Sequence, residues 1–110
     1  MPGKFEVFED KGGKFRFRLK AANGQIILAS QGYKSKDSAM SGIESVRKNA
    51  ASDAQFERKE SKGQFMFNLK ATNGQVIGTS ERYTTAAACE NGIQSVMKNA
   101  LGANVEDQTG

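Results

Sequence analysis

The chain has 110 residues, of which 37% are hydrophobic and 25% are charged, which is typical of one soluble globular domain spanning residues 1–110. No apolar run approaches the roughly 18 residues that a membrane span requires, and the first residues lack the apolar stretch of a secretory signal. We therefore expect a cytoplasmic protein with no membrane partner. The net charge of +4 is uneven, because residues 1–52 carry +5 and residues 53–110 carry −1. An anionic partner for the first half would explain this asymmetry, and so would ordinary surface solubility.

The segments 4–9 and 15–20 alternate apolar and polar residues with a period of two, which predicts two β-strands. In the second segment, Phe15, Phe17 and Leu19 share one face. The other face carries a row of four cations, which we call the basic ladder: Lys14, Arg16, Arg18 and Lys20. Two glycines between the segments predict a turn.

A second hairpin is predicted at residues 22–24, where Ala-Asn-Gly separates two apolar runs. A two-residue turn would place Leu28 opposite Leu19. A three-residue turn with a left-handed glycine would instead place Ile27 opposite Leu19 and Ala29 opposite Phe17. In the second half of the chain Ile27 recurs as isoleucine but Leu28 becomes Gly78, and a core leucine is costly to lose. We therefore expect the three-residue turn, with Ile27 inside.

A helix is predicted to begin after Ser35, a residue type that suits the N-cap. One stripe of this helix is apolar: Ala39, Ile43, Val46 and Ala50. We expect Asn49 to take a left-handed capping conformation at the helix end, and Asn99 to do the same in the second half.

The chain repeats itself. Residues 13–50 align without a gap to residues 63–100, and 19 of the 38 positions are identical. Such similarity indicates a tandem duplication. We divide the chain into repeat 1, residues 1–52, and repeat 2, residues 53–110.

Phe56-Glu57 follows the first predicted helix and Val105-Glu106 follows the second, which predicts a strand after each helix. Two units of this kind can share one sheet and one core. The predicted fold is α+β, with tandem β3-α-β repeats forming one antiparallel sheet of six or seven strands. Two helices cover one face, and the repeats are related by pseudo-twofold symmetry.

The sequence offers little for catalysis. It has no histidine, which removes the commonest general base and metal ligand. Cys89 occupies the helix position of the apolar Ala39, so we interpret it as a small core residue. No phosphate loop, carboxylate pair or metal-ligand spacing is present. We therefore predict a protein that is not an enzyme and that needs no cofactor or metal.

Two small features recur in both repeats. Gly42 and Gly92 lie mid-helix, where glycine costs about 1 kcal/mol relative to alanine, so we expect a close approach of each helix to the other helix or to the sheet. Tyr33 and Tyr83 precede the two helices. We expect them to pack over the helix entry, although an aromatic residue beside a sheet can also stack on a ligand.

The basic ladder is the main candidate binding site, since cations at two-residue spacing can follow a phosphate backbone. The equivalent positions of repeat 2 are Gln64, Met66, Asn68 and Lys70, so such a site would belong to repeat 1 alone. No aromatic residue alternates with the ladder, unlike in sheet-based RNA readers. A charged, solvated strand face is the competing explanation.

The Leu-Lys-Ala-x-Asn-Gly turn and the Gly-Ile-x-Ser-Val-x-Lys-Asn-Ala helix end occur twice, and with them nearly the whole chain resembles the YegP-like family. This is an uncharacterised group of short bacterial proteins with one unit or two in tandem. The resemblance implies paired β3-α-β units in one antiparallel sheet, with the strand after each helix exchanged onto the partner unit. It implies no catalytic or binding residues.

Two functions are consistent with these observations. The first is a non-enzymatic binding or accessory module for an anionic partner such as nucleic acid. The second is a small-molecule-binding or stress-related protein that uses the seam between the repeats, for which a pocket lined by both helices would be evidence. Because one chain holds both units, we expect a monomer.

Overall fold

The computed structural model describes residues 3–109. The elements follow one another as β1 (Lys4–Glu9), β2 (Phe15–Lys20), β3 (Ile26–Ala29), α1 (Lys36–Asn49), a 3₁₀ turn (Asp53–Gln55), β4 (Phe56–Ser61), β5 (Gln64–Lys70), β6 (Val76–Thr79), α2 (Ala86–Ala100) and β7 (Asn104–Asp107).

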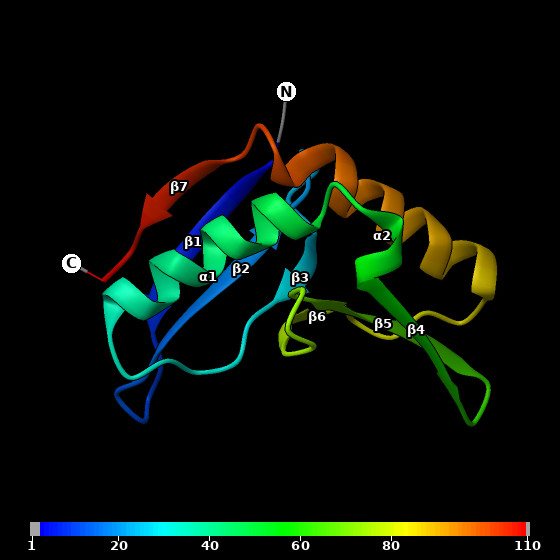
Figure 1. Cartoon of the computed structure of the whole chain (residues 1–110), viewed down its shortest axis with the longest axis horizontal. Helices are drawn as coiled ribbons and strands as arrows, with labels where there is room; N and C mark the ends of the chain where they lie inside the picture. Colours follow the sequence, from blue (N-terminus) through cyan, green and yellow to red (C-terminus); the bar gives the residue numbers. More distant parts are fainter. Residues whose placement is uncertain (1–2, 110) are drawn as a thin grey trace.

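The strands form one seven-stranded sheet in the order β4-β5-β6-β3-β2-β1-β7, and both helices cover the same face (Figure 1). The two repeats meet at β3 and β6 in the middle of the sheet. Helix α1 of repeat 1 also contacts β6, and α2 of repeat 2 also contacts β3. The predicted α+β architecture of tandem repeats is confirmed.

One strand departs from the antiparallel arrangement that we predicted. β7 runs parallel to β1, with Phe5 beside Val105 and Glu6 beside Glu106. The cause lies at the end of α2, where the Oδ1 atom of Asn99 accepts a hydrogen bond of 2.9 Å from the backbone N–H of Gly3. The chain therefore leaves α2 at the N-terminal end of β1, and it can only continue along β1 in the same direction.

The strand after each helix does join the other repeat, as the family resemblance implies. α1 leads into β4, which pairs with β5 of repeat 2, and α2 leads into β7, which pairs with β1 of repeat 1. Within residues 3–109 the edge strands are β4 and β7, and the two ends of the sheet differ because β1 has the additional parallel neighbour β7 whereas its counterpart β4 has none.

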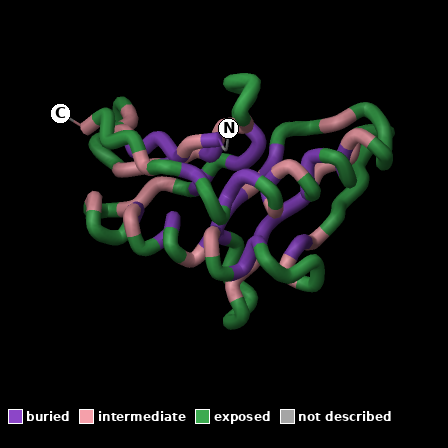
Figure 2. Tube along the Cα trace, turned by 90° about the horizontal axis from the view of Figure 1, so that it is seen from above, coloured by how far each residue is buried: buried purple, intermediate pink, exposed green. Residues whose placement is uncertain are grey.

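The core lies between the sheet and the helices, and Figure 2 shows buried residues through the middle of the molecule with exposed turns around them. In β1 and β2 the inward pairs are Phe5 with Leu19 and Val7 with Phe17. The predicted helix stripe is buried in both repeats: Ala39, Ile43, Val46, Ala50, Cys89, Ile93, Val96 and Ala100. Ser35 and Thr85 cap their helices by accepting hydrogen bonds from backbone N–H groups three residues on.

The hairpin between β2 and β3 has the expected turn but a different register. Gly24 has a φ of 87°, as a three-residue turn requires. Beyond the turn, however, a β-bulge shifts the pairing of β2 with β3 by one residue, so Leu28 and not Ile27 lies opposite Leu19. Both Ile27 and Leu28 are buried. The predicted pairing of Ile27 is therefore wrong, although its burial is confirmed.

The slip shows why Leu28 becomes Gly78 in repeat 2. A Cβ atom added at Gly78 would lie 2.7 Å from both Cγ and Cδ2 of Leu28. The two equivalent positions face the same space at the pseudo-twofold seam, which holds only one large side chain.

The mid-helix glycines mark a close approach of helix to sheet. A Cβ atom at Gly42 would lie 2.8 Å from Cε2 of Phe17 and 2.7 Å from the hydroxyl oxygen of Tyr33. Tyr33 stacks on Phe17 with ring centroids 6.2 Å apart. Gly92 has the same relation to Phe67 and the second tyrosine. The tyrosines pack at the helix entry, as expected.

The asparagines at the helix ends do not have the predicted left-handed conformation, since Lys62 is the only non-glycine residue with positive φ in the described range. Each Nδ2 atom instead donates back into its own helix, to the carbonyl oxygen four residues earlier. Each Oδ1 atom faces the other repeat: that of Asn99 accepts from Gly3, and that of Asn49 accepts from Gln55 at 3.4 Å. The two asparagines therefore link the end of each helix to the residue just before β1 or β4.

Candidate anion-binding site

The face of the sheet opposite the helices is open, and we call it the open face. Its composition follows from the alternation of the strands: Phe5 and Val7 point to the core, so Lys4, Glu6 and Phe8 point to the open face. These three residues lie directly opposite Lys20, Arg18 and Arg16, respectively.

The structure places three of the four ladder residues side by side on this face. Arg16, Arg18 and Lys20 all lie in β2, whereas Lys14 precedes the strand and its side chain passes next to Gly32. The ladder is therefore a row of three strand residues with an exposed lysine at one end.

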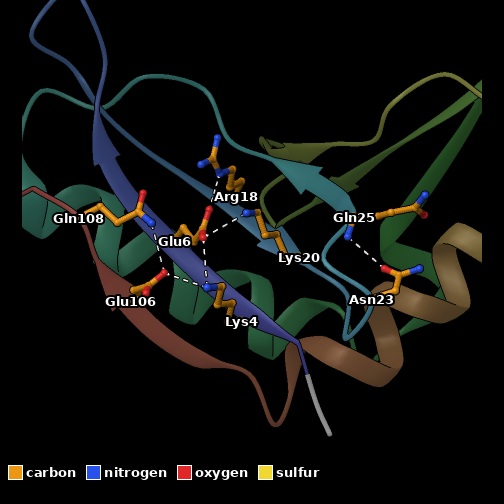
Figure 3. A network of polar contacts seen from close by, with 8 residues as sticks. All are labelled: Lys4, Glu6, Arg18, Lys20, Asn23, Gln25, Glu106 and Gln108. Atoms are coloured by element: carbon orange, nitrogen blue, oxygen red, sulfur yellow. Dashed lines mark hydrogen bonds and ion pairs between the residues drawn. The ribbon is translucent and has the colours of Figure 1, made fainter.

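The arginines are each held by a carboxylate. The Nε atom of Arg16 donates to Oδ2 of Asp10 at 2.6 Å, and the Nε atom of Arg18 donates to Oε1 of Glu6 at 2.6 Å. Arg18 also stacks on Phe8, with its guanidinium carbon 4.8 Å from the ring centroid. Within residues 3–109 both Nη atoms of Arg18 lack a hydrogen-bond acceptor, and Figure 3 shows them pointing away from Glu6.

Glu6 is the centre of this network (Figure 3). Only 2% of the residue is exposed, and its carboxylate also pairs with Lys20 at 3.2 Å and Lys4 at 3.4 Å. Burial on its own would raise the pKa of Glu6, but the hydrogen bonds from Arg18 and Lys20 outweigh it and lower the pKa to about 2. Lys4 bridges the network to β7 through Glu106 at 3.0 Å.

The carboxylates orient the cations and also reduce their net charge. Lys4 and the four residues of the basic ladder give this face five cations. They face the three carboxylates of Glu6, Asp10 and Glu106, which leaves two positive charges in excess. A carboxylate on Nε leaves the Nη side of the planar guanidinium available for a second anion. Within residues 3–109 this holds for both Nη atoms of Arg18, whereas Nη1 of Arg16 also donates to the Ser30 carbonyl oxygen at 3.5 Å. The Cα atoms of the two arginines are about 6.6 Å apart along the strand.

Phe8 was not identified from the sequence, because aromatic residues were sought only within the segment that carries the basic ladder. The structure places Phe8 opposite Arg16 on the same face, so an aromatic residue does lie among the cations. The alternation of segment 4–9 was the available signal, since residues 5 and 7 point inward and residue 8 must then point outward.

Repeat 2 keeps the carboxylate but loses the arginines. Glu57 accepts hydrogen bonds from Lys70 at 3.1 Å and from Asn68 at 3.2 Å, and the bond from Lys70 is the main reason that its pKa is lowered. The positions of Arg16 and Arg18 are occupied by Met66 and Asn68. The pair of guanidinium forks therefore belongs to repeat 1 alone.

A second feature of the open face lies at the seam. A hollow of about 310 Å³ is lined by residues 29–31 of repeat 1 and by residues 76 and 78–80 of repeat 2. It is formed by β3, β6 and the residues after them, and not by the two helices as the small-molecule hypothesis expected. We call it the seam hollow.

Cys89 has the environment of a core residue. It is 3% exposed, and burial is the main reason that the pKa of its thiol is raised, which disfavours the nucleophilic thiolate. Neither helix in the described part of the chain is long and apolar enough to cross a membrane.

Comparison with known proteins places the chain in a family. The sequence model described as "Domain of unknown function (DUF1508)" matches twice, over residues 10–57 and 60–107. The chain belongs to the DUF1508 family. Both matches begin in the first hairpin of a repeat; the first ends two residues into β4, and the second covers all of β7.

The relatives differ in how much of their length this chain matches. A UPF0339 protein of Treponema denticola is 62% identical over 50 residues, which are 46% of this chain and 86% of that protein. The "UPF0339 protein in ptx operon 5'region" of Stutzerimonas stutzeri is 62% identical over 61 residues, which are 56% of this chain and only 55% of that protein. A third relative is the "UPF0339 protein YegP" of Yersinia pestis, 48% identical over 59 residues, or 54% of this chain and 53% of that protein.

Solved structures agree over the full length. The NMR structure of yegP from E. coli, described as a protein of unknown function, superimposes with a TM-score of 0.95 at 48% identity and covers 100% of this chain and 96% of that one. A UPF0339 protein of Shewanella oneidensis gives a TM-score of 0.93 at 44% identity, covering 99% and 93%. The resemblance to YegP-like proteins and the predicted two-repeat fold are confirmed.

Proposed function

We propose that this protein is a non-enzymatic binding module that holds an anionic polymer on the open face of repeat 1. Arg16 and Arg18 are the anchors, and Lys14 and Lys20 flank them. One observation carries the proposal: each arginine is fixed through Nε by a carboxylate at 2.6 Å, and within residues 3–109 both Nη atoms of Arg18 have no acceptor, whereas Nη1 of Arg16 donates to the Ser30 carbonyl oxygen at 3.5 Å. A guanidinium held in this way loses little side-chain entropy when it binds a phosphate.

The strength of binding follows from the net charge of the face. With two positive charges in excess, we expect a dissociation constant on the order of 10⁻⁴ M at physiological salt. The logarithm of the association constant should fall with the logarithm of the salt concentration, with a slope of about −0.7 for each phosphate contacted on a single strand. Because one chain holds both units and already pairs the strand that follows each helix, we expect the protein to act as a monomer.

The test is an NMR titration of the ¹⁵N-labelled protein with short single- and double-stranded oligonucleotides at low and moderate salt. Saturable shifts should centre on Arg16, Arg18 and Lys20 and should weaken as salt rises. Arg16→Gln and Arg18→Gln should each weaken binding. Lys59→Gln, which removes a cation from the open face of repeat 2, should leave it unchanged. Absence of shifts at low salt would refute the proposal.

The seam hollow supports a second candidate, a small uncharged ligand. Its walls combine the small side chains of Ala29, Ser30 and Ser80 with the apolar Val76, a composition suited to a planar ring. Shifts at Ala29 and Thr79 on addition of an uncharged nucleoside, without any shift at Arg16, would favour this function.

A further inference from the structure

The seam hollow exists because β3 and β6 barely pair. The two strands share a single residue pair, Ala29 with Thr79, which are the last residues of their strands. Each strand is only four residues long. A β-bulge shifts the pairing of β3 with β2 by one residue, and another shifts the pairing of β6 with β5. The middle of a continuous sheet is thus open over about 310 Å³.

The hollow lies next to the anchor of the proposed binding site. Ala29, which lines the hollow, lies opposite Arg18 across β2 and β3, and Ser30, which also lines it, accepts a hydrogen bond of 3.5 Å from Nη1 of Arg16 through its carbonyl oxygen. Thr79 lines it from repeat 2, and its hydroxyl donates a hydrogen bond of 2.9 Å to Oδ1 of Asn68 on the neighbouring strand. Adjacent strands are about 4.8 Å apart, so the step from Arg18 to the hollow is within one nucleotide's reach from phosphate to base.

We infer that the ligand of the open face is single-stranded nucleic acid, with phosphates on Arg16 and Arg18 and one base in the seam hollow. The inference rests on the proposed function and specifies its ligand. The hollow has the size of a small ligand site and offers an apolar wall at Val76 and a hydrogen-bonding side chain at Thr79. A polyanion without bases leaves this site empty, and a duplex keeps its bases stacked and out of reach.

The test compares three probes of equal phosphate count: an oligothymidylate of about eight nucleotides, an abasic strand and a duplex. Ala29→Leu fills the hollow from an exposed position, and Ser61→Leu adds the same bulk to the open face at the far edge strand β4. Arg18→Gln removes the phosphate anchor. Matching thermal unfolding curves establish that the variants fold.

We expect Ala29→Leu to weaken oligothymidylate binding by roughly fivefold to tenfold, from the lost burial of one base, and to leave the abasic strand unaffected. Ser61→Leu should change neither, and Arg18→Gln should weaken both probes. Equal binding of duplex and single strand, or no effect of Ala29→Leu on oligothymidylate, overturns this inference while the phosphate proposal stands. Absence of binding by all three probes overturns both.

Discussion

The shared space at the seam makes a quantitative prediction about Leu28 and Gly78. Leu28→Ala removes a fully buried side chain whose neighbour across the seam has none to fill the gap, so the free energy of unfolding should fall by about 3 kcal/mol. Gly78→Ala alone places a Cβ atom 2.7 Å from two carbon atoms of Leu28, which should cost about 1–3 kcal/mol.

The double variant should be less destabilised than the sum of the two. With Leu28 shortened, the new methyl group at position 78 meets no clash and fills part of the cavity. We expect a favourable coupling free energy of about 1–3 kcal/mol. The assay is urea unfolding followed by circular dichroism, with the free energies taken from linear extrapolation.

A matched cycle serves as the control. Val7 is also buried but lies in β1, three strands from β6, so Val7→Ala combined with Gly78→Ala should be additive. If the Leu28–Gly78 cycle is also additive to within about 0.5 kcal/mol, the two positions do not compete for one space, and our explanation of Gly78 is refuted.

Three further predictions concern stability. Asn99→Ala removes the acceptor of the Gly3 N–H group and should cost about 1–3 kcal/mol in urea unfolding, more than Asn49→Ala, whose partner is a side chain at 3.4 Å; the reverse order would contradict the role given to Asn99. Glu6 has a folded-state pKa of about 2, below its ordinary value, so its contribution to stability is present above about pH 4.5 and is lost as the pH falls toward 2. Glu6→Gln should therefore reduce the acid loss of stability in pH-dependent melts, and an unchanged profile would count against this network. Gly42→Ala should destabilise the protein by about 1–3 kcal/mol in spite of its better helix propensity, because the methyl group meets a phenylalanine ring of β2; a rise in melting temperature would show that the helix can shift.

Much of the candidate site could be predicted from the alternation in segments 4–9 and 15–20, which fixes which cations share a face. The pairing partners could not. Asp10 reaches Arg16 from the turn before the strand, and Glu6 reaches Arg18 from the neighbouring strand. Whether a row of cations is free or held depends on such cross-strand neighbours, which are known only once the register is known.

The sequence by itself determined the duplication, the α+β class, the helix caps at Ser35 and Thr85 and the buried helix stripes. These features are local or repeat at a fixed spacing, so they follow from short-range chemistry.

Only the tertiary structure decided the slip that places Leu28 opposite Leu19, the parallel course of β7 and the seam hollow. Each of these depends on contacts between segments far apart in the chain: Leu28 with Gly78, Gly3 with Asn99, and Ala29 with Thr79. A single side chain can fill the space at a pseudo-twofold axis, so two nearly identical repeats must differ there. That requirement comes from packing in three dimensions and leaves no periodic signal in the sequence.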